Sequence, residues 1–226
     1  MKRIEVASAV DAAVDQLRDA ILTGEMQPGE AIRIKLLAEQ LGISHIPIRE
    51  ALRQLEAEGL VVSSPRRTPV VAGVAVEELT ALYELRLMVE IPTARRAVEQ
   101  SGSADLAAVR TALRRMEETA GEPGSPDYWD IHRDLHWALI AAGANVWTQR
   151  MLDPLWRATE RYVRLFVTRY RSPDDALRMH RALVAALVGG DPDALATELT
   201  EHFAETERVV RAGYGAAMEA RQAAAG

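Results

Sequence analysis

Four histidines in the C-terminal two-thirds of the chain are the residues best suited to chemistry. His132 and His136 are four positions apart and therefore share one face of an expected helix, while His180 and His202 lie on two later helices. Neutral imidazoles are ligands for Zn, Ni, Cu or Fe, and four of them can converge inside a helical bundle. The alternative is that a pair at this spacing is simply exposed, or satisfied in a core.

An enzyme built on such a metal would need more than the metal ligands. A helical metalloenzyme would use the ion to activate water and would need an additional acid or base beside it. Asp134 and Glu160 are the visible candidates, and neither belongs to a catalytic motif. We therefore expect that the protein is not an enzyme.

A second group of chemistry-bearing residues lies in residues 36–60, LLAEQLGISHIPIREALRQLEAEGL. The pattern predicts a short helix, a tight turn at Gly42 and a second helix capped by Ser44. The polar side of the second helix carries Ser44, His45, Arg49 and Arg53. A helix-turn-helix places such a helix in the DNA major groove, where an arginine can discriminate guanine by about 1–3 kcal/mol. The alternative is the solvated face of an ordinary amphipathic helix.

A β-hairpin is expected directly after this segment. Two β-prone runs, residues 60–62 and 70–72, flank the turn SSPRRTP, so Arg66 and Arg67 would lie on the wing of a winged helix. The net charge is -6, yet residues 33–67 hold six basic and four acidic residues. Positive charge confined to the DNA-reading segment indicates a compact footprint on phosphate.

The elements that must position these residues are mostly helices. We expect a mostly α protein with an N-terminal winged helix-turn-helix (three helices plus a small β-hairpin) in residues 1–73. An all-α antiparallel bundle of six or seven helices follows in residues 74–226. Pro92 is expected to kink or break its helix near Glu90, and residues 121–126 are expected to form a loop. Helices are predicted over residues 7–23, 34–41, 44–58, 77–100, 104–119, 127–142, 146–170, 174–188 and 193–214.

The composition excludes several classes of site and of protein. There is no cysteine, so disulfides, thiolate metal sites and cysteine nucleophiles are excluded. The N-terminus lacks the apolar run of a signal peptide, and no stretch approaches the roughly 18 apolar residues that span a bilayer. We expect a soluble cytoplasmic protein that does not contact a membrane.

The N-terminal motifs carry a family resemblance. ILTG at residues 21–24 is followed by PGE at residues 28–30 and then by the helix-turn-helix segment. With this spacing, residues 10–72 closely resemble the DNA-binding domain of GntR-family transcriptional regulators. The family usually has arginine where His45 stands and a glycine near Thr68 at the wing tip. The resemblance implies DNA contacts from the wing and from Lys35, Ser44, His45, Pro47 and Arg49.

The C-terminal segments resemble the FadR-type, or FCD, effector domain. The resemblance rests on ELTALYELRLMVE at residues 78–90, HRDLHWALIAAGAN at residues 132–145, and the segment that joins the last two histidines. It implies a metal held by one aspartate and three histidines, with a histidine here at the aspartate position. The implied ligands of this divalent transition metal, Zn or Ni, are His132, His136, His180 and His202.

The same resemblance implies an effector pocket. Arg86 and Asn145 are the implied effector contacts, and the alternatives are an interhelical salt bridge for Arg86 and a helix C-cap after Gly143 for Asn145. Four neutral histidines leave a divalent ion at +2, whereas one aspartate and three histidines leave +1. An anionic effector should then be attracted more strongly.

Together these expectations describe a ligand-responsive, DNA-binding transcriptional regulator. We expect a homodimer that binds a pseudo-palindromic double-stranded operator, because two equivalent recognition helices need two half-sites. We expect the protein to act as a repressor. A small carboxylic-acid effector beside the metal would modulate DNA binding. The alternatives are a metal-sensing repressor in which the ion is the signal and, less favoured, a helical metalloenzyme.

Overall fold

The chain forms two compact units, each with its own hydrophobic core. The computed structural model describes residues 5–119, 126–167 and 170–225. The units are Met1–Ala75 and Val76–Gly226. Their boundary lies two residues after the position proposed from the sequence.

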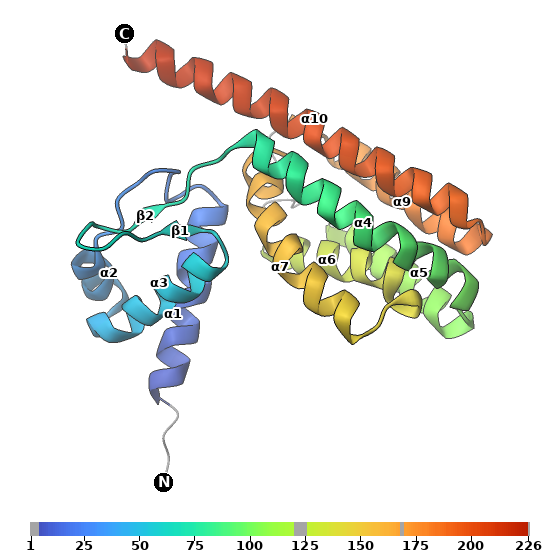
Figure 1. The fold of residues 1–226 in the computed structure, drawn as a ribbon, viewed down its shortest axis with the longest axis horizontal. Coiled ribbons are helices and arrows are strands. Elements are labelled where there is room, and N and C mark those ends of the chain that lie inside the picture. The colour runs from blue at the N-terminus through green and yellow to red at the C-terminus, as the bar shows by residue number, and fades with distance from the viewer. Residues whose placement is uncertain (1–4, 120–125, 168–169, 226) are drawn as a thin grey trace. The chain divides into compact units, whose positions relative to one another are not determined.

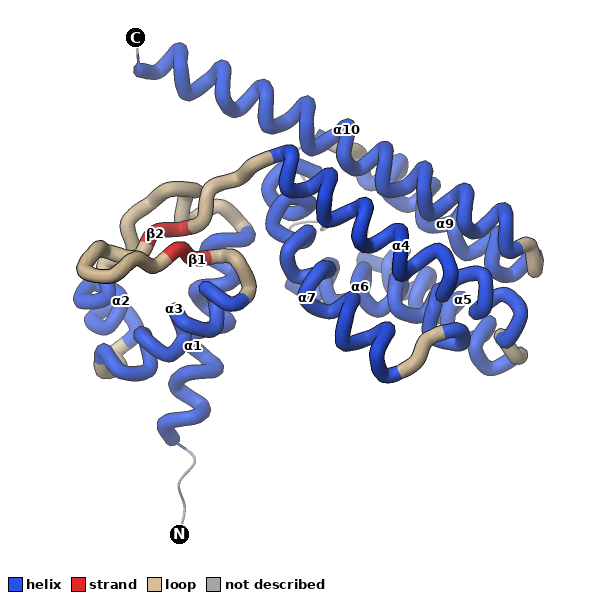
Figure 2. The backbone as a smooth tube through the Cα atoms, in the orientation of Figure 1, coloured by secondary structure: helices blue, strands red, loops and turns tan. Residues whose placement is uncertain are grey.

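The described part of the N-terminal unit is three helices and a hairpin, as predicted (Figure 1). The strands pair antiparallel with Val61 opposite Val71, and they are the only strands in the described chain (Figure 2). The elements are α1 Glu5–Leu22, α2 Ile34–Leu41, α3 His45–Ala57, β1 Val61–Val62 and β2 Val70–Val71.

The turn between α2 and α3 depends on a left-handed glycine. Gly42 has φ 66° and caps α2, a conformation that glycine adopts without steric cost. The apolar face of α3, including Ile48 and Leu55, is buried in the core that also holds Leu17 of α1, so the arginine side of α3 faces outward. Ser44 occupies the N-cap position of α3, but its side chain makes no capping hydrogen bond.

The C-terminal unit is a helical bundle, as predicted. Helix α4 packs against α7 and α10, and α5 packs against α6 and α9 (Figure 1). The elements are α4 Val76–Gln100, α5 Ser103–Thr119, α6 Pro126–Ile140, the 3₁₀ turn η1 Ala141–Gly143, α7 Val146–Tyr162, the π-helical segment η2 Val163–Val167, α9 Pro173–Gly189 and α10 Pro192–Ala225. None of the described helices is long and apolar enough to cross a membrane.

The bounds predicted for α4 agree with the structure to one residue, but two other predicted helix ends were wrong. Of the kink or break expected at Pro92, the break does not occur, because buried residues continue on both sides of the proline, at Glu90 and Ala94. The helix expected to reach residue 170 ends as α7 at Tyr162, where η2 begins. Helix α10 continues to Ala225, past the expected end at Tyr214. The predicted loop at 121–126 falls largely outside the described residues.

Candidate functional site

The four histidines of the C-terminal unit converge from three helices. His132 and His136 come from α6, His180 from α9 and His202 from α10. One ring nitrogen from each lies within 4.8 Å of those of the others. Three of the rings are buried and His132 is partly exposed. The i, i+4 pair predicted from the sequence is therefore one half of a four-imidazole cluster.

Hydrogen bonding leaves the cluster with free ring nitrogens. His180 Nδ1 lies 2.6 Å from the carbonyl oxygen of Ala176 and donates to it, which leaves the Nε2 lone pair facing His136 Nε2 at 3.3 Å. The Nδ1 atoms of His136 and His202 are buried and have no partner among the described residues. Buried, unsatisfied nitrogens of this kind are expected where a ligand completes a site.

All four rings are held in the form that binds metals. Burial lowers the pKa of each histidine below 6.5, and neighbouring histidines and arginines lower it further. For His180, burial outweighs the opposing effect of the hydrogen bond to Ala176, and the pKa is about 4. The rings are therefore neutral at pH 7, as ligation requires.

The separation of one pair of ring nitrogens suits a metal ion. Metal–nitrogen bonds of about 2.0–2.1 Å put neighbouring ligand atoms roughly 3–3.4 Å apart, which includes the 3.3 Å between His136 and His180, while the whole set extends to 4.8 Å. The nearby acids of α6 face elsewhere: Asp130 pairs with Arg133, and Asp134 pairs with Arg115 at 3.3 Å. In the described chain the candidate ligand set is thus four histidines with no carboxylate.

A small cavity adjoins the cluster and is lined by Arg86. The cavity, about 50 Å³, also touches His132, His136 and Trp156. Arg86 is buried and donates from Nε to Glu90 Oε1 at 2.7 Å, while its guanidinium lies 4.3 Å from the ring centroid of Phe203. Arg86 therefore does form a salt bridge, but within α4, so the alternative of an interhelical salt bridge is wrong.

Asn145 has a structural role. Its side-chain oxygen accepts hydrogen bonds from the backbone N–H groups of Trp147 and Thr148, and it caps α7 in a capping box. Asn145 is exposed and lines neither cavity beside the histidines. The geometry gives the effector-binding prediction for Asn145 no support.

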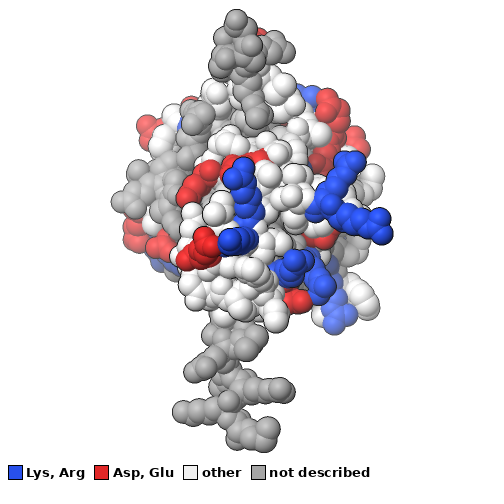
Figure 3. Space-filling view, turned by 90° about the vertical axis from the view of Figure 1, so that its left-hand side faces the viewer, with Lys and Arg blue, Asp and Glu red and all other residues white. Residues whose placement is uncertain are grey.

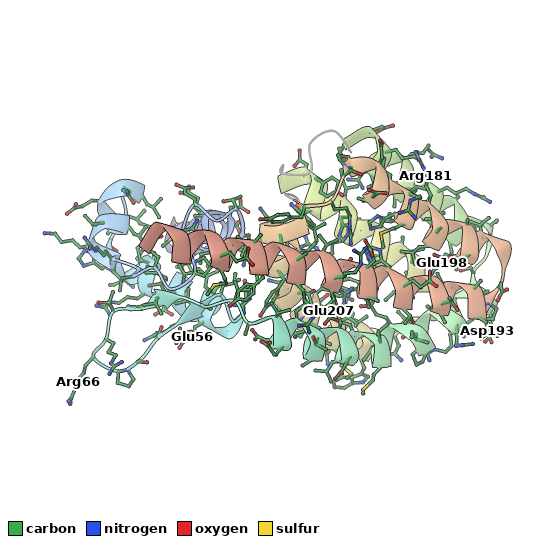
Figure 4. The ribbon with its side chains drawn as sticks, turned by 90° about the horizontal axis from the view of Figure 1, so that it is seen from above. Glu56, Arg66, Arg181, Asp193, Glu198 and Glu207 are labelled. Atoms are coloured by element: carbon green, nitrogen blue, oxygen red, sulfur yellow. The ribbon has the colours of Figure 1, made fainter. Side chains whose placement is uncertain are left out.

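In the N-terminal unit a cationic groove runs between α3 and the wing. The groove, about 730 Å³, is lined by Arg33, Lys35, Arg49, Arg53, Arg66 and Arg67, with Glu56 as its acidic residue. Lys and Arg side chains stand out on the face in Figure 3, and Figure 4 shows Arg66 projecting from the wing tip. All six basic residues of the 33–67 segment therefore meet in one place, which is the electrostatic footprint of a DNA-binding surface.

The predicted contacts at the start of α3 divide into two kinds. Ser44 and His45 are exposed at the N-terminus of the helix, where backbone N–H groups can receive a phosphate. Pro47 is buried with Ile48 in the first turn, where a proline is tolerated. It has no exposed surface to support a DNA contact and stays a prediction from resemblance alone.

The wing tip carries a strained residue. The backbone N–H of Arg67 donates to Ser64 O at 3.1 Å, closing a β-turn with Pro65 second and Arg66 third. Arg66 has φ 64°, the left-handed region, and is the one non-glycine residue in the described chain with positive φ. The position that favours glycine is therefore Arg66 and not the neighbourhood of Thr68.

Comparison with known sequences identifies the family. Residues 9–71 match the family described as bacterial regulatory proteins, gntR family, and residues 81–205 match the family described as FCD domain. The chain belongs to the GntR family. It is a DNA-binding transcriptional regulator with an FCD effector domain, a kind of domain that often binds a metal.

Relatives of this GntR regulator match nearly its whole length. It is 29% identical to BphR of Paraburkholderia xenovorans, described as an uncharacterized HTH-type transcriptional regulator, over 91% of this chain and 86% of the relative. It is 29% identical to the HTH-type transcriptional repressor GlaR of Escherichia coli, over 83% and 89%. A solved GntR regulator from Rhodococcus sp. RHA1 shares the fold, with a TM-score of 0.75 at 22% identity over 92% of this chain and 99% of that chain.

Family membership excludes the enzyme alternative, since GntR relatives are regulators. The two acids suggested for catalysis are engaged in ion pairs. Asp134 is exposed beside Arg115, and Glu160 pairs with Arg164 at 3.2 Å and Arg133 at 3.5 Å.

Three residues of the regulator's sites were not predicted. Arg33, at the N-cap position of α2, lines the cationic groove of the protein. Its positive charge within the basic 33–67 segment was the signal that could have indicated this. Glu90 pairs with Arg86, and their i, i+4 spacing could have indicated this. Arg171 lines a second cavity beside the histidines, and no local pattern points to it.

Proposed function

We propose that this regulator is a homodimeric repressor whose operator binding is modulated by a small carboxylate effector. The effector would bind beside a divalent metal, Zn or Ni, held by His132, His136, His180 and His202. The observation that carries the proposal is the convergence of four neutral imidazoles beside a cavity lined by Arg86, in a unit separate from the cationic groove. The sign of regulation follows the relative GlaR, a repressor by name.

The role of the metal would be to bind and orient the effector. When bound, the ion supplies a charge of +2 that the four neutral rings do not reduce, and so attracts a carboxylate. His180 would present Nε2 in a fixed tautomer because its Nδ1 is held by Ala176 O. Arg86 lines the cavity, and Glu90 holds its guanidinium in place. Effector binding would shift the dimer between states of different operator affinity.

The DNA-reading part is tested by fluorescence anisotropy. The probe is a labelled duplex selected from random-sequence DNA by the purified regulator. Arg49→Ala should weaken binding about tenfold or more, because a bidentate arginine–guanine contact is lost. Arg110→Ala, which removes an exposed arginine from α5, should bind as wild type does. Unchanged binding by Arg49→Ala would remove Arg49 from the DNA interface.

The same assay separates the effector proposal from a metal-sensing repressor. The protein is dialysed against chelator and reloaded with Zn²⁺ or Ni²⁺, and each form is titrated with acetate, lactate and succinate. Under the proposal, carboxylate shifts duplex affinity only in the metal-loaded form. If metal removal alone changes affinity and carboxylates add nothing, the ion is the signal. If neither matters, the histidine cluster has no regulatory role.

The dimer proposal rests on exposed apolar side chains of the helical unit. Helices α4 and α7 pack against each other, and both carry large apolar residues that are at least half exposed. These residues are Leu85, Met88, Val146, Trp147 and Met151. Clusters of exposed apolar residues mark interaction surfaces, and GntR regulators typically dimerise. We propose that a second copy of the chain covers these two helices.

A further inference from the structure

The histidine cluster has a second cavity on another side, and it contains an unexpected cation. This cavity, about 40 Å³, is lined by Arg171, Tyr83 and Thr206 together with all four histidines. His132, His136 and Arg86 line both cavities, so the two cavities adjoin each other beside the cluster. A ligand at the histidines therefore has two arginines nearby, Arg86 and Arg171.

Arg171 is partly buried and, unlike the buried arginines of the helical unit, forms no ion pair with a carboxylate of the described residues. The buried arginines Arg86, Arg161 and Arg164 each pair with a carboxylate, from Glu90, Glu78 and Glu160 in turn. Within the described chain, Arg171 makes one side-chain hydrogen bond, from Nη2 to Thr206 Oγ1 at 3.1 Å. Its Nε is buried and has no partner.

An arginine in this state is costly to the folded protein. The Arg171 side chain is partly buried, and a buried Nε–H without an acceptor destabilises the fold. Burial lowers the pKa of Arg171, and the charges of Glu205 and Asp175 only partly oppose this. Buried polar groups without a hydrogen-bond partner are characteristic of binding sites, where a ligand supplies the missing partner.

The charges around the two cavities define the missing partner. Arg86 is paired with Glu90 and the four imidazoles are uncharged, whereas Arg171 forms no ion pair within the described residues. The Tyr83 phenol lines the same cavity, and burial raises its pKa to about 12, so it stays a neutral hydrogen-bond donor. An arginine and a phenol that both donate hydrogen bonds suit a carboxylate.

We propose that Arg171 binds a second acidic group of the effector, which is therefore a small dicarboxylate. One carboxylate is held at the histidine cluster on the Arg86 side, and the other reaches Arg171 in the second cavity. The small volumes of the two cavities restrict the ligand to a few carbons. This assignment rests on the proposed function, because it deepens the identity of the same effector.

Calorimetric titration of the full-length, Zn²⁺-loaded regulator tests the assignment. The dicarboxylates malonate, succinate and malate are compared with the monocarboxylates acetate, propionate and lactate. The test variant is Arg171→Gln, and the matched control is Arg178→Gln, which removes an exposed arginine paired with Asp175 seven residues further along. Wild type and the control should bind at least one dicarboxylate about tenfold or more tighter than the monocarboxylates.

Arg171→Gln should lose this preference and bind dicarboxylates as weakly as monocarboxylates, with monocarboxylate affinity unchanged. Three results would overturn the assignment: no dicarboxylate binds wild type, wild type shows no preference, or the preference survives in Arg171→Gln. The melting temperature of ligand-free Arg171→Gln should equal or exceed that of wild type, because a partly buried cation with an unpartnered Nε–H has been removed. A clear fall would assign Arg171 a structural role instead.

The same proteins separate this assignment from the proposed function. If succinate binds through Arg171 and operator affinity does not change, the regulatory proposal fails and the dicarboxylate site stands. If both classes of carboxylate bind equally and both shift operator affinity, the regulatory proposal stands and the role of Arg171 is wrong.

Discussion

At the scale of single residues, the histidine cluster is defined by its neutrality. The rings are kept uncharged by burial, and one of them, His180, also has its tautomer set by Ala176 O. The sequence predicted which histidines take part, because His132 and His136 share a helix face. It could not predict that Arg171, almost forty residues from His132, lies beside them, since no short-range pattern connects the two.

The neutral histidines make the stability of the metal-free protein depend on pH. Their pKa values are lowered in the fold from an unfolded value near 6.5, so the unfolded chain binds more protons below pH 6.5. The free energy of unfolding is therefore highest above about pH 6.5, where the histidines are neutral in both states, and it decreases as the pH falls below this value. Between pH 7.5 and 5.5 we expect a loss of about 1 kcal/mol for each buried histidine.

Urea unfolding of chelator-treated protein measures this loss. Tryptophan fluorescence reports on the helical unit, because all four tryptophans belong to it. His180→Gln should show a smaller pH dependence than wild type, and His45→Gln, changed in the other unit, should retain it. A free energy of unfolding that is flat across this range would contradict the neutral cluster.

Arg66 offers a test of backbone strain at the wing tip. Arg66→Gly should be more stable than Arg66→Ala by about 1 kcal/mol, because alanine keeps the cost of a left-handed backbone and glycine removes it. Both variants lose the same charge, so the comparison isolates the backbone. Thermal unfolding followed by circular dichroism gives the difference. Equal stability of the two variants would mean that the turn relaxes at no cost.

At the scale of elements, packing decides where helices end and how closely they approach. Periodicity predicted every helix of the described chain, but the proline suggested a kink or a break at Pro92, where burial on both sides keeps α4 continuous. It also missed η2, because a π-helical segment has the same composition as an α-helix. Local propensity identifies an element, and tertiary contacts set its limits.

Gly143 marks a close approach of η1 to α4 in the helical unit. A Cβ atom there would lie 2.2 Å from Thr93 O and 2.4 Å from Ala97 N, both backbone atoms of α4. Gly143→Ala should therefore lower the free energy of unfolding by about 1–3 kcal/mol, because the backbone of α4 must move.

Gly215→Ala in α10 is the matched control, since no atom lies within 4 Å of the added Cβ. It should be neutral or stabilising by about 0.5–1 kcal/mol, the usual advantage of alanine over glycine in a helix. Denaturant titration of the two variants provides both values. A wild-type-like Gly143→Ala would show that η1 does not pack tightly on α4.

At the scale of the whole molecule, the chain separates DNA reading from ligand sensing. The basic residues of the 33–67 segment lie in one unit, and the histidines lie in the other. A change at the histidines must therefore reach the DNA through the arrangement of two copies or of the two units. This makes the oligomeric state a central quantity for the regulator.

The proposed dimer predicts the effect of a charge at its interface. Trp147 is 64% exposed, and Trp147→Glu should convert the dimer to monomer, because a carboxylate would be buried between the two copies. Val62→Glu, at a valine that is 50% exposed on the wing, should stay dimeric. Light scattering after size exclusion distinguishes the two masses. A dimeric Trp147→Glu would place the interface elsewhere.

The sequence by itself determined the fold class and the family, and it named the four histidines of the cluster and five of the six basic residues of the cationic groove. These depend on residue type and on local spacing. Only the tertiary structure decided which side chains meet. It placed Arg33 in the cationic groove of the protein and made Asn145 the N-cap of α7. It also brought Arg171, which forms no ion pair within the described residues, next to the histidines. The physical reason is that helix periodicity fixes neighbours three or four residues apart, whereas contacts between distant segments depend on how the helices pack.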